Sequence, residues 1–221
     1  LSKDGDGFFT GVVTATSYAG DGSGLTGVAG TENIRTNTNA TFLQNINVGV
    51  AITAGKLGIG FTDNNIKVGN TALDSLTTGT NNTAVGHNAL TATTTGSQNV
   101  AVGAKALDNN TTGVNNVAIG YEALDTNTTT DKNIAIGYQS LKDNTASGNV
   151  AVGHMTLFEN STGDRNVALG QESLYNNTTG TRNVAVGSPA LYTNTTGGYN
   201  VAIGKDALTT NNANNNTAVG D

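Results

Sequence analysis

The chain has no cysteine, no tryptophan and a single proline among its 221 residues, and aromatic residues make up 5% of it. Without cysteine, disulfide bonds cannot stabilise the fold. With so few large side chains the chain can fill only a thin interior, which argues against one or two ordinary globular cores. We therefore expect it to bury surface by stacking repeated units or several chains.

Charge is also scarce, because charged residues make up 12% of the chain and the formal net charge is -6. The ten lysines and arginines are scattered singly and form no basic stripe, so we expect no nucleic-acid partner. No apolar run is long enough to span a membrane, and we expect no membrane insertion. The chain begins at Leu1 and stops just after a repeat glycine, which suggests a segment of a longer polypeptide.

One five-residue motif recurs ten times from residue 65 onward. Its first position is Asn, its second an aliphatic residue or Thr, its third usually Ala, its fourth an aliphatic residue, and its fifth Gly. Seven of the intervals between successive glycines are 17 residues long and two are 16. A fixed short period of this kind indicates a solenoid, in which each repeat forms one coil. The closing glycines are Gly69, Gly86, Gly103, Gly120, Gly137, Gly153, Gly170, Gly187, Gly204 and Gly220.

Three repeat positions predict how each coil is built. Aliphatic residues or Thr stand three and one positions before each glycine, and such alternation indicates a strand with one buried face. We expect these residues to fill the coil together with a leucine four positions after the glycine. The segment around that leucine is either a second strand or a helical turn, and we favour an irregular return. The leucines are Leu73, Leu90, Leu107, Leu124, Leu141, Leu157, Leu174, Leu191 and Leu208.

Asparagine stands four positions before the glycine in all ten repeats. We expect its side chain to bond the next coil, and the glycine to allow a tight or left-handed corner. Because stacked strands lie about 4.8 Å apart, nine intervals predict a rod section of about 43 Å. Both 16-residue repeats lose their residue in the segment that resembles Asn-Thr-Thr-Gly, which we interpret as a surface turn.

The predicted fold class is all-β: a parallel β-solenoid, or β-roll, of about nine 17-residue coils, assembled as a homotrimeric fibre. We expect a strand-and-turn segment over residues 1–30, a connector of short strands over residues 31–64, and the solenoid over residues 65–221, cut short at its C-terminus.

Alanine fills the position between the two aliphatic residues in nine of the ten repeats, and Lys67 is the exception. If the aliphatic residues point inward, this position points outward. A solvent face has no reason to exclude large or charged side chains, whereas a close interface does. We therefore predict that three chains pack through Ala84, Ala101, Ala118, Ala135, Ala151, Ala168, Ala185, Ala202 and Ala218.

The repeats Asn116–Gly120 and Asn200–Gly204 resemble the head repeats of YadA-like trimeric autotransporter adhesins, which form left-handed parallel β-rolls of three chains. The longer phrase from Asn116 to Thr130 resembles shaft repeats of phage tail fibres and related fibre proteins. The opening from Gly11 to Val28 is similar to segments of marine phage tail and structural proteins.

These resemblances imply a structural protein rather than an enzyme. The first expectation is a segment of a trimeric phage tail fibre or virion appendage that spaces and presents a receptor-binding tip. The alternative is a bacterial surface adhesin whose head binds host matrix or cells. The implied partners are two further copies of the chain, other virion tail or fibre proteins, and a cell-surface glycan or protein receptor, and the implied location is a virion or a cell surface.

Three aromatic residues are the candidate binding site. Phe158, Tyr175 and Tyr192 each stand five positions after a repeat glycine on consecutive coils, which places their rings one above another. Such a ladder could bind sugar, because pyranose faces pack on aromatic rings. The interpretation that we favour is that the rings stack on one another and stiffen the rod.

No residue pattern predicts a catalytic, cofactor-binding or metal site. The glycines from Gly22 to Gly27 match a dinucleotide fingerprint in form, but no helix follows them. Asp4, Asp6 and Asp21 lack the spacing of a calcium loop. Two further classes stay open to test: an ice-binding solenoid, suggested by paired threonines in the turns, and a glycan depolymerase, for which the scattered carboxylates offer no working pair within one chain.

Overall fold

The computed structural model describes residues 64–220 of the chain. The predictions for residues 1–30 and for the connector up to residue 63 lie outside the described residues, as do Asp4, Asp6, Asp21 and the glycine cluster at Gly22. Within residues 64–220 no helix is long and apolar enough to cross a membrane.

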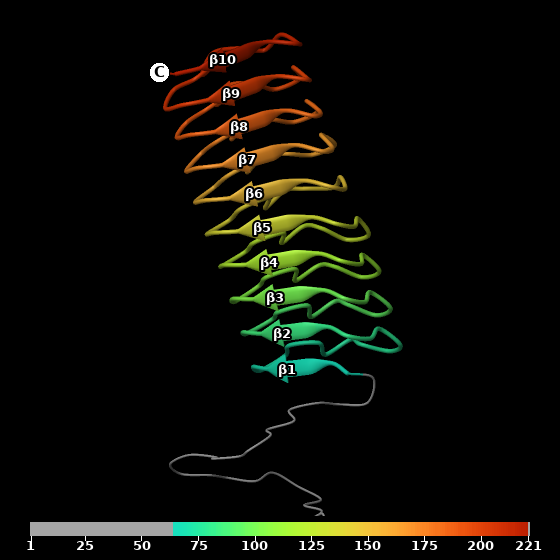
Figure 1. Cartoon of the computed structure of the whole chain (residues 1–221). Helices are drawn as coiled ribbons and strands as arrows, with labels where there is room; N and C mark the ends of the chain where they lie inside the picture. The colour runs from blue at the N-terminus through green and yellow to red at the C-terminus, as the bar shows by residue number, and fades with distance from the viewer. Residues whose placement is uncertain (1–63, 221) are drawn as a thin grey trace, which may run out of the picture. The chain divides into compact units, whose positions relative to one another are not determined.

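Ten strands of three residues each form one parallel sheet in which the strand order follows the sequence (Figure 1). The predicted all-β parallel solenoid is therefore confirmed for the described residues. The strands are β1 (Ile66–Val68), β2 (Thr83–Val85), β3 (Val100–Val102), β4 (Val117–Ile119), β5 (Ile134–Ile136), β6 (Val150–Val152), β7 (Val167–Leu169), β8 (Val184–Val186), β9 (Val201–Ile203) and β10 (Thr217–Val219).

The strand register follows the repeat without slippage. In the pair β3·β4, for example, Val100 lies opposite Val117, and the central alanines of the two strands lie opposite each other. The β5·β6 pair keeps the same register across a 16-residue interval, with Ala135 opposite Ala151. The lost residue is therefore absorbed in the turn, as the sequence predicts.

Between the strands the chain returns through turns. In residues 64–220 each coil contains one strand, and the return segments contain neither a strand nor a helix. This confirms the irregular return. Each return is bonded to the next one: the Leu124 N–H, for example, donates to the Ser140 carbonyl at 3.1 Å. The repeat leucines point into the coil as predicted, and seven of them, from Leu90 to Leu191, are completely buried.

The predicted orientation of the strands is wrong. The central alanines of β2 to β9 are completely buried within the coil of a single chain, whereas none of the residues flanking them is buried. These alanines cannot contact another chain while the coil is intact, so the predicted interface through this position is wrong as well. The misplaced residues are Ala84, Ala101, Ala118, Ala135, Ala151, Ala168, Ala185 and Ala202, while Ala218 in the last strand is partly exposed.

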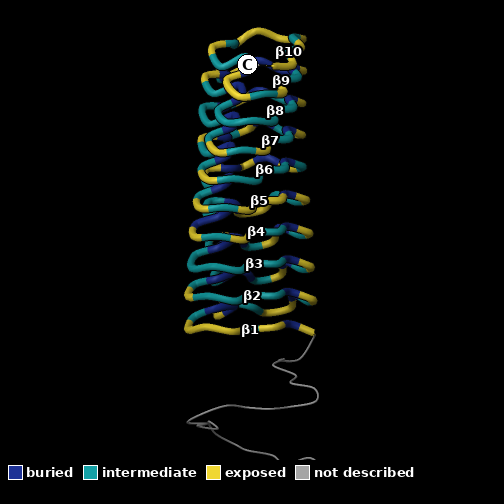
Figure 2. The backbone as a smooth tube through the Cα atoms, turned by 60° about the vertical axis from the view of Figure 1, so that its left-hand side comes forward, coloured by how far each residue is buried: buried dark blue, intermediate teal, exposed yellow. Residues whose placement is uncertain are grey.

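The physical reason for the reversal is the thinness of the coil. Its core consists of the strand alanines, the repeat leucines and small residues three positions after each glycine, such as Ala106 and Ala123. A coil this thin leaves room for a methyl group beneath the strand but not for a larger branched side chain. Figure 2 shows that the buried stretches recur at the same place in successive coils.

The repeat asparagines occupy the rest of the interior and form a ladder. The side-chain oxygen of each asparagine accepts a hydrogen bond from the backbone N–H of the asparagine in the next coil, at 2.8 to 3.0 Å. The side-chain amide donates to a backbone carbonyl 13 or 14 residues ahead, at 2.8 to 2.9 Å. The predicted role of asparagine in linking coils is therefore confirmed.

A second asparagine ladder lies where the sequence predicts a surface turn. The first asparagine of the turn segment is completely buried in six consecutive coils, at Asn110, Asn127, Asn144, Asn160, Asn177 and Asn194. In each of these coils its amide donates to a carbonyl of its own turn at 2.7 to 3.2 Å. The threonines that follow it are partly or fully exposed, so the segment is a surface turn on one side and core on the other.

Candidate functional site

The three predicted aromatic residues lie together on the return side of the rod. The ring centroids of Phe158 and Tyr175 are 5.2 Å apart, and those of Tyr175 and Tyr192 are 5.4 Å apart. The ring planes are nearly parallel, at 9° and 19°. The Lys142 ammonium lies 5.9 Å from the centroid of Phe158 and continues the column into the preceding coil.

A second aromatic ladder was not singled out in the sequence. Tyr121, Tyr138 and His154 each follow a repeat glycine directly, and their ring centroids are 5.5 and 5.2 Å apart. The two tyrosines are more exposed than those of the first ladder, at 42% and 43% of their surface. The sequence does contain a signal for this ladder, because an aromatic ring directly follows the glycine in three consecutive repeats.

Stacking determines what either ladder can offer a ligand. Parallel rings at this separation cover a large part of each other's faces, as aromatic pairs prefer in an offset arrangement. The middle rings, Tyr138 and Tyr175, each have a ring on both sides. Tyr192 ends its ladder, because Thr209 occupies the same repeat position in the next coil. A sugar could reach the hydroxyls and the terminal face of the ladder, and the stack itself stiffens the rod.

A polar cluster joins three successive coils beside the second ladder. The Glu122 carboxylate is 7% exposed and accepts hydrogen bonds from Gln139 at 2.8 Å and from Lys142 at 2.9 Å. Lys105, from the preceding coil, lies 3.4 Å away. The sequence alone does not indicate this cluster, because the residue two positions after the glycine, here Glu122, differs between repeats.

The hydrogen bonds from Gln139 and Lys142 lower the pKa of the Glu122 carboxyl to about 2. The same contact raises the pKa of Lys142, and the neighbouring carboxylate raises the pKa of the Tyr121 hydroxyl. Glu122 therefore stays ionised and saturated with donors at neutral pH. Such a carboxylate is suited to holding coils together rather than to exchanging protons with a substrate.

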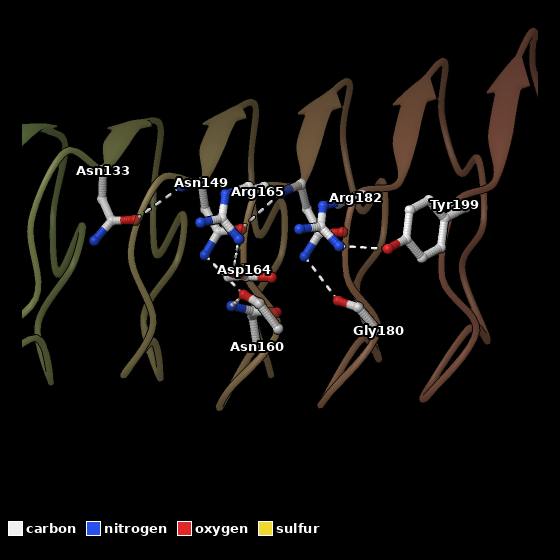
Figure 3. A network of polar contacts seen from close by, with 10 residues as sticks. Asn133, Asn149, Asn160, Asp164, Arg165, Gly180, Arg182 and Tyr199 are labelled. Atoms are coloured by element: carbon white, nitrogen blue, oxygen red, sulfur yellow. Dashed lines mark hydrogen bonds and ion pairs between the residues drawn. The ribbon is translucent and has the colours of Figure 1, made fainter.

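A shallow groove lies where the shortened coil interrupts the row of turns. It has a volume of about 510 Å³ and is lined by Lys132, Thr145, Ala146, Ser147, Gly148, Thr162, Asp164 and Arg165. Its charged groups are partly used within the chain, because Arg165 pairs with Asp164. In the adjoining coils Arg182 donates to the Tyr199 hydroxyl beside the inner asparagine ladder, as Figure 3 shows.

His87 and His154 are both exposed and lie in different coils. Within residues 64–220 no three His, Cys, Asp or Glu side chains are grouped so that they could hold a metal ion. Eight positions after the glycine, a turn threonine or Ser161 donates its side-chain hydroxyl to a backbone carbonyl of the next coil at six of the nine repeat positions. These bonds are 2.8 to 3.2 Å long. The six hydroxyls are therefore already used within the fold.

No protein-family model, no curated protein and no solved structure matches the chain. The class of protein is therefore defined by the fold itself. Residues 64–220 form a parallel β-solenoid repeat protein, with about nine turns at a predominant spacing of 17 residues.

Proposed function

We propose that the chain is a structural fibre protein, a rigid segment of a phage tail fibre or similar virion appendage that spaces and presents a receptor-binding tip. The observation that carries the proposal is the direction of its interactions. Strand pairing, return hydrogen bonds and the inner asparagine ladder all link one coil to the next along the rod. The turn asparagines also link coils through their side chains, as from Asn177 to Asn160 at 2.7 Å. The resemblance of the repeats to fibre shafts supports the same function.

Consecutive coils are tied together at several points of their cross-section. Between the coils of β4 and β5 the Val117 N–H donates to the Asn133 carbonyl at 2.8 Å, and the Gly137 N–H donates to the Ile119 carbonyl at 2.8 Å. Inside the coil the Asn133 N–H donates to the side chain of Asn116 at 2.9 Å. Bending the rod would lengthen these bonds on one side, so the arrangement resists bending. A stiff spacer holds binding tips at a fixed separation and thereby raises their effective concentration.

A bacterial surface adhesin is the second candidate, and the two aromatic ladders favour it. In an adhesin the rod itself would contact a host glycan or protein, and Tyr138, which is 43% exposed, would offer its hydroxyl for hydrogen bonds to a sugar. In a shaft the ladders serve only to stiffen the rod.

Two measurements on the purified 221-residue chain test the proposal. Small-angle X-ray scattering should give a rod-like cross-section, and electron microscopy should show straight particles whose repeat section is about 43 Å long. Compact particles without an elongated section would contradict a fibre function.

A glycan array separates the two candidates. A shaft should bind no glycan, and a variant carrying Tyr121→Ala, Tyr138→Ala and Tyr175→Ala should behave like the original chain. An adhesin should bind one class of glycan and lose that binding in the triple variant. Turnover of a polysaccharide by the purified chain, lost on a point substitution, would replace both candidates with an enzyme.

A further inference from the structure

One row of exposed side chains on the rod is interrupted at a single coil. The row is formed by the residue directly before each repeat asparagine, and Figure 3 shows part of it, from Arg165 through Arg182 to Tyr199. Nine of its ten members carry an exposed side chain, and the tenth is Gly148. The row therefore has one gap, between Lys132 and Arg165. The nine exposed members are Asn64, Asn81, Gln98, Asn115, Lys132, Arg165, Arg182, Tyr199 and Asn215.

Neither packing nor backbone conformation requires glycine at this gap. A Cβ atom on Gly148 would meet only the Arg165 side chain, at 3.7 Å, whereas every other described glycine except Gly220 would bring a Cβ atom within 3.0 Å of another atom. The φ of Gly148 is 76°, and the nine other members of the row have φ values between 55° and 61° although none of them is glycine. Gly148 thus keeps open a space that a side chain fills in the other coils.

This gap coincides with the shallow groove at the shortened coil. The groove has a volume of about 510 Å³, which lies in the range of sites for small ligands. Lys132 and Arg165 stand on its two sides, because they occupy the row one coil before and one coil after Gly148. The one carboxylate in the lining, Asp164, pairs with Arg165, so the lining has a surplus of one positive charge.

Lys132 is a cation that the fold leaves without a partner. Residues 64–220 contain five lysines, and the other four form ion pairs within the chain, with Asp74, Glu122 or Asp206 as partners. Lys132 pairs with no carboxylate of the described residues, and its side chain is exposed. An anion in the groove would give Lys132 a partner without breaking an existing contact.

The shortened coil also leaves backbone donors without a partner. In a full-length coil three consecutive turn N–H groups donate to one carbonyl of the next coil, as those of residues 161–163 donate to Thr178 at 2.9 to 3.2 Å. In the shortened coil the N–H groups of Ala146 and Ser147 make no hydrogen bond within residues 64–220. Both residues line the groove. Successive backbone N–H groups in a turn are typical binders of anions.

We propose that the groove docks the side chain of a glutamate or aspartate on an acidic segment of a partner protein. The carboxylate lies between Lys132 and Arg165 and accepts hydrogen bonds from the N–H groups of Ala146 and Ser147, because all of these groups are donors suited to an oxyanion. An inorganic anion would fill only a small part of the groove. The docking goes beyond the proposed fibre function, since it gives one coil of the rod a lateral partner.

The lining favours a peptide carboxylate over an acidic sugar. A sugar ring packs its face on an aromatic or flat apolar surface, and no aromatic residue lines this groove. The one aliphatic side chain in the lining, Ala146, is 8% exposed. The groups that are present are charges and hydrogen-bond donors, which an aspartate or glutamate side chain satisfies by itself. Because the whole chain has a net charge of -6, the binding of an anion depends on this local surplus of positive charge.

Fluorescence anisotropy with a labelled peptide tests the docking. The probe is a short peptide of alternating glutamate and glycine, and its matched control has glutamine in place of glutamate. The purified 221-residue chain should bind the glutamate peptide and not the glutamine peptide. Its affinity should fall by roughly threefold or more when the salt concentration rises from about 50 to about 500 mM, because the contact is between charges. No binding of the glutamate peptide at about 1 mM, or equal binding of both peptides, would overturn the proposal.

Gly148→Asn is the decisive variant, because it fills the gap with the residue that occurs most often in the row. Asparagine tolerates a positive φ, and this substitution removes no charge, so the variant should keep its melting temperature and bind the peptide at least about tenfold more weakly. Lys132→Gln should weaken binding by a similar factor. Lys205→Gln makes the same change of charge away from the groove and should leave the affinity within about twofold. Unchanged binding in Gly148→Asn, or equal weakening by the two lysine variants, would count against the groove.

A carbodiimide, which joins a carboxylate to an adjacent amine, locates the bound peptide. Mass spectrometry should place the adduct on Lys132 in the original chain, and the adduct should be lost in Gly148→Asn. Adducts distributed evenly over the lysines would show that the peptide has no defined site. Binding of a glucuronic acid oligosaccharide in place of the peptide would make the groove a sugar site and overturn the partner assigned to it.

Discussion

The side chain that most constrains this protein is an amide. Asn116 accepts a hydrogen bond from the backbone of Asn133 at 2.9 Å and donates one to the Thr130 carbonyl at 2.8 Å, and the residue is completely buried. Asparagine carries both a donor and an acceptor on a short side chain, so one residue satisfies two backbone groups that water cannot reach. This explains why the position never varies along the chain.

Replacing this amide should be costly. In Asn116→Ala the buried Asn133 N–H loses its partner and the Thr130 carbonyl keeps the Asn127 amide, at 3.2 Å, as its donor, so we expect a loss of about 1 to 3 kcal/mol in the free energy of unfolding. Asn109→Ala is the matched control, because that amide donates to the Asp125 carbonyl at 3.0 Å from an exposed position. The control should lose less than about 1 kcal/mol. Equal losses in urea unfolding would contradict the role of the ladder.

A second effect at this scale depends on pH. The Glu122 carboxyl has a pKa of about 2 in the folded chain, below its ordinary value of 4.5. Because the pKa is depressed by folding, its contribution to stability is present above pH 4.5 and is lost as the pH falls toward 2. Allowing for screening at the rod surface, we expect on the order of 1 to 3 kcal/mol.

Thermal unfolding between pH 2 and pH 6 checks this contribution. The original chain should lose more stability on acidification than Glu122→Gln, whose amide does not titrate. Asp143→Asn, which replaces an exposed carboxylate on the return side, should keep the original pH profile. If Glu122→Gln showed the same decline as the original chain, another group would be responsible.

At the scale of the element, the corner after each strand requires glycine. Gly120 has a φ of 137°, and a Cβ atom at this position would lie 2.3 Å from the Gly137 carbonyl oxygen of the next coil. Both the backbone conformation and the close approach exclude a side chain. The corners of adjacent coils are thus stacked as tightly as the strands.

Gly120→Ala should therefore cost at least about 3 kcal/mol, or prevent the local coil from forming, because a backbone atom cannot move aside. Gly148→Ala provides the comparison. Its φ is 76°, but a Cβ atom would meet only the Arg165 side chain, at 3.7 Å, so the backbone strain of about 1 kcal/mol is the main cost. Chemical denaturation of the two variants distinguishes them, and similar losses would show that stacking of the corners contributes little.

At the scale of the whole molecule, each coil of the described region contacts only its neighbours. A solenoid of this kind should tolerate the loss of an entire coil, because the new neighbours are equivalent to the old ones. Deleting residues 87–103 joins Gly86 to Ala104 and restores the repeat. We expect unchanged sheet content and a rod shorter by about 4.8 Å in scattering.

Deleting residues 87–94 is the control, because it removes about half a coil and so breaks the period. This variant should lose cooperative unfolding around the junction. If the two deletions behaved alike, stability would not depend on the match between neighbouring coils.

The sequence by itself determined the solenoid, its parallel in-register sheet, the asparagine links and the inward leucines. These follow from the repeat, because identical positions at a fixed spacing must meet in stacked coils. The aromatic stack from Phe158 to Tyr192 followed from the same rule. The tertiary structure decided which face of each strand points inward, since period-two alternation marks two faces without saying which is the core. Because the return segment lies close to the inner face of the sheet, only alanine fits beneath the strand, and the valines and isoleucines therefore point outward. The buried turn asparagines and the Glu122 cluster likewise depend on how the return folds over the sheet, which no repeat position encodes locally.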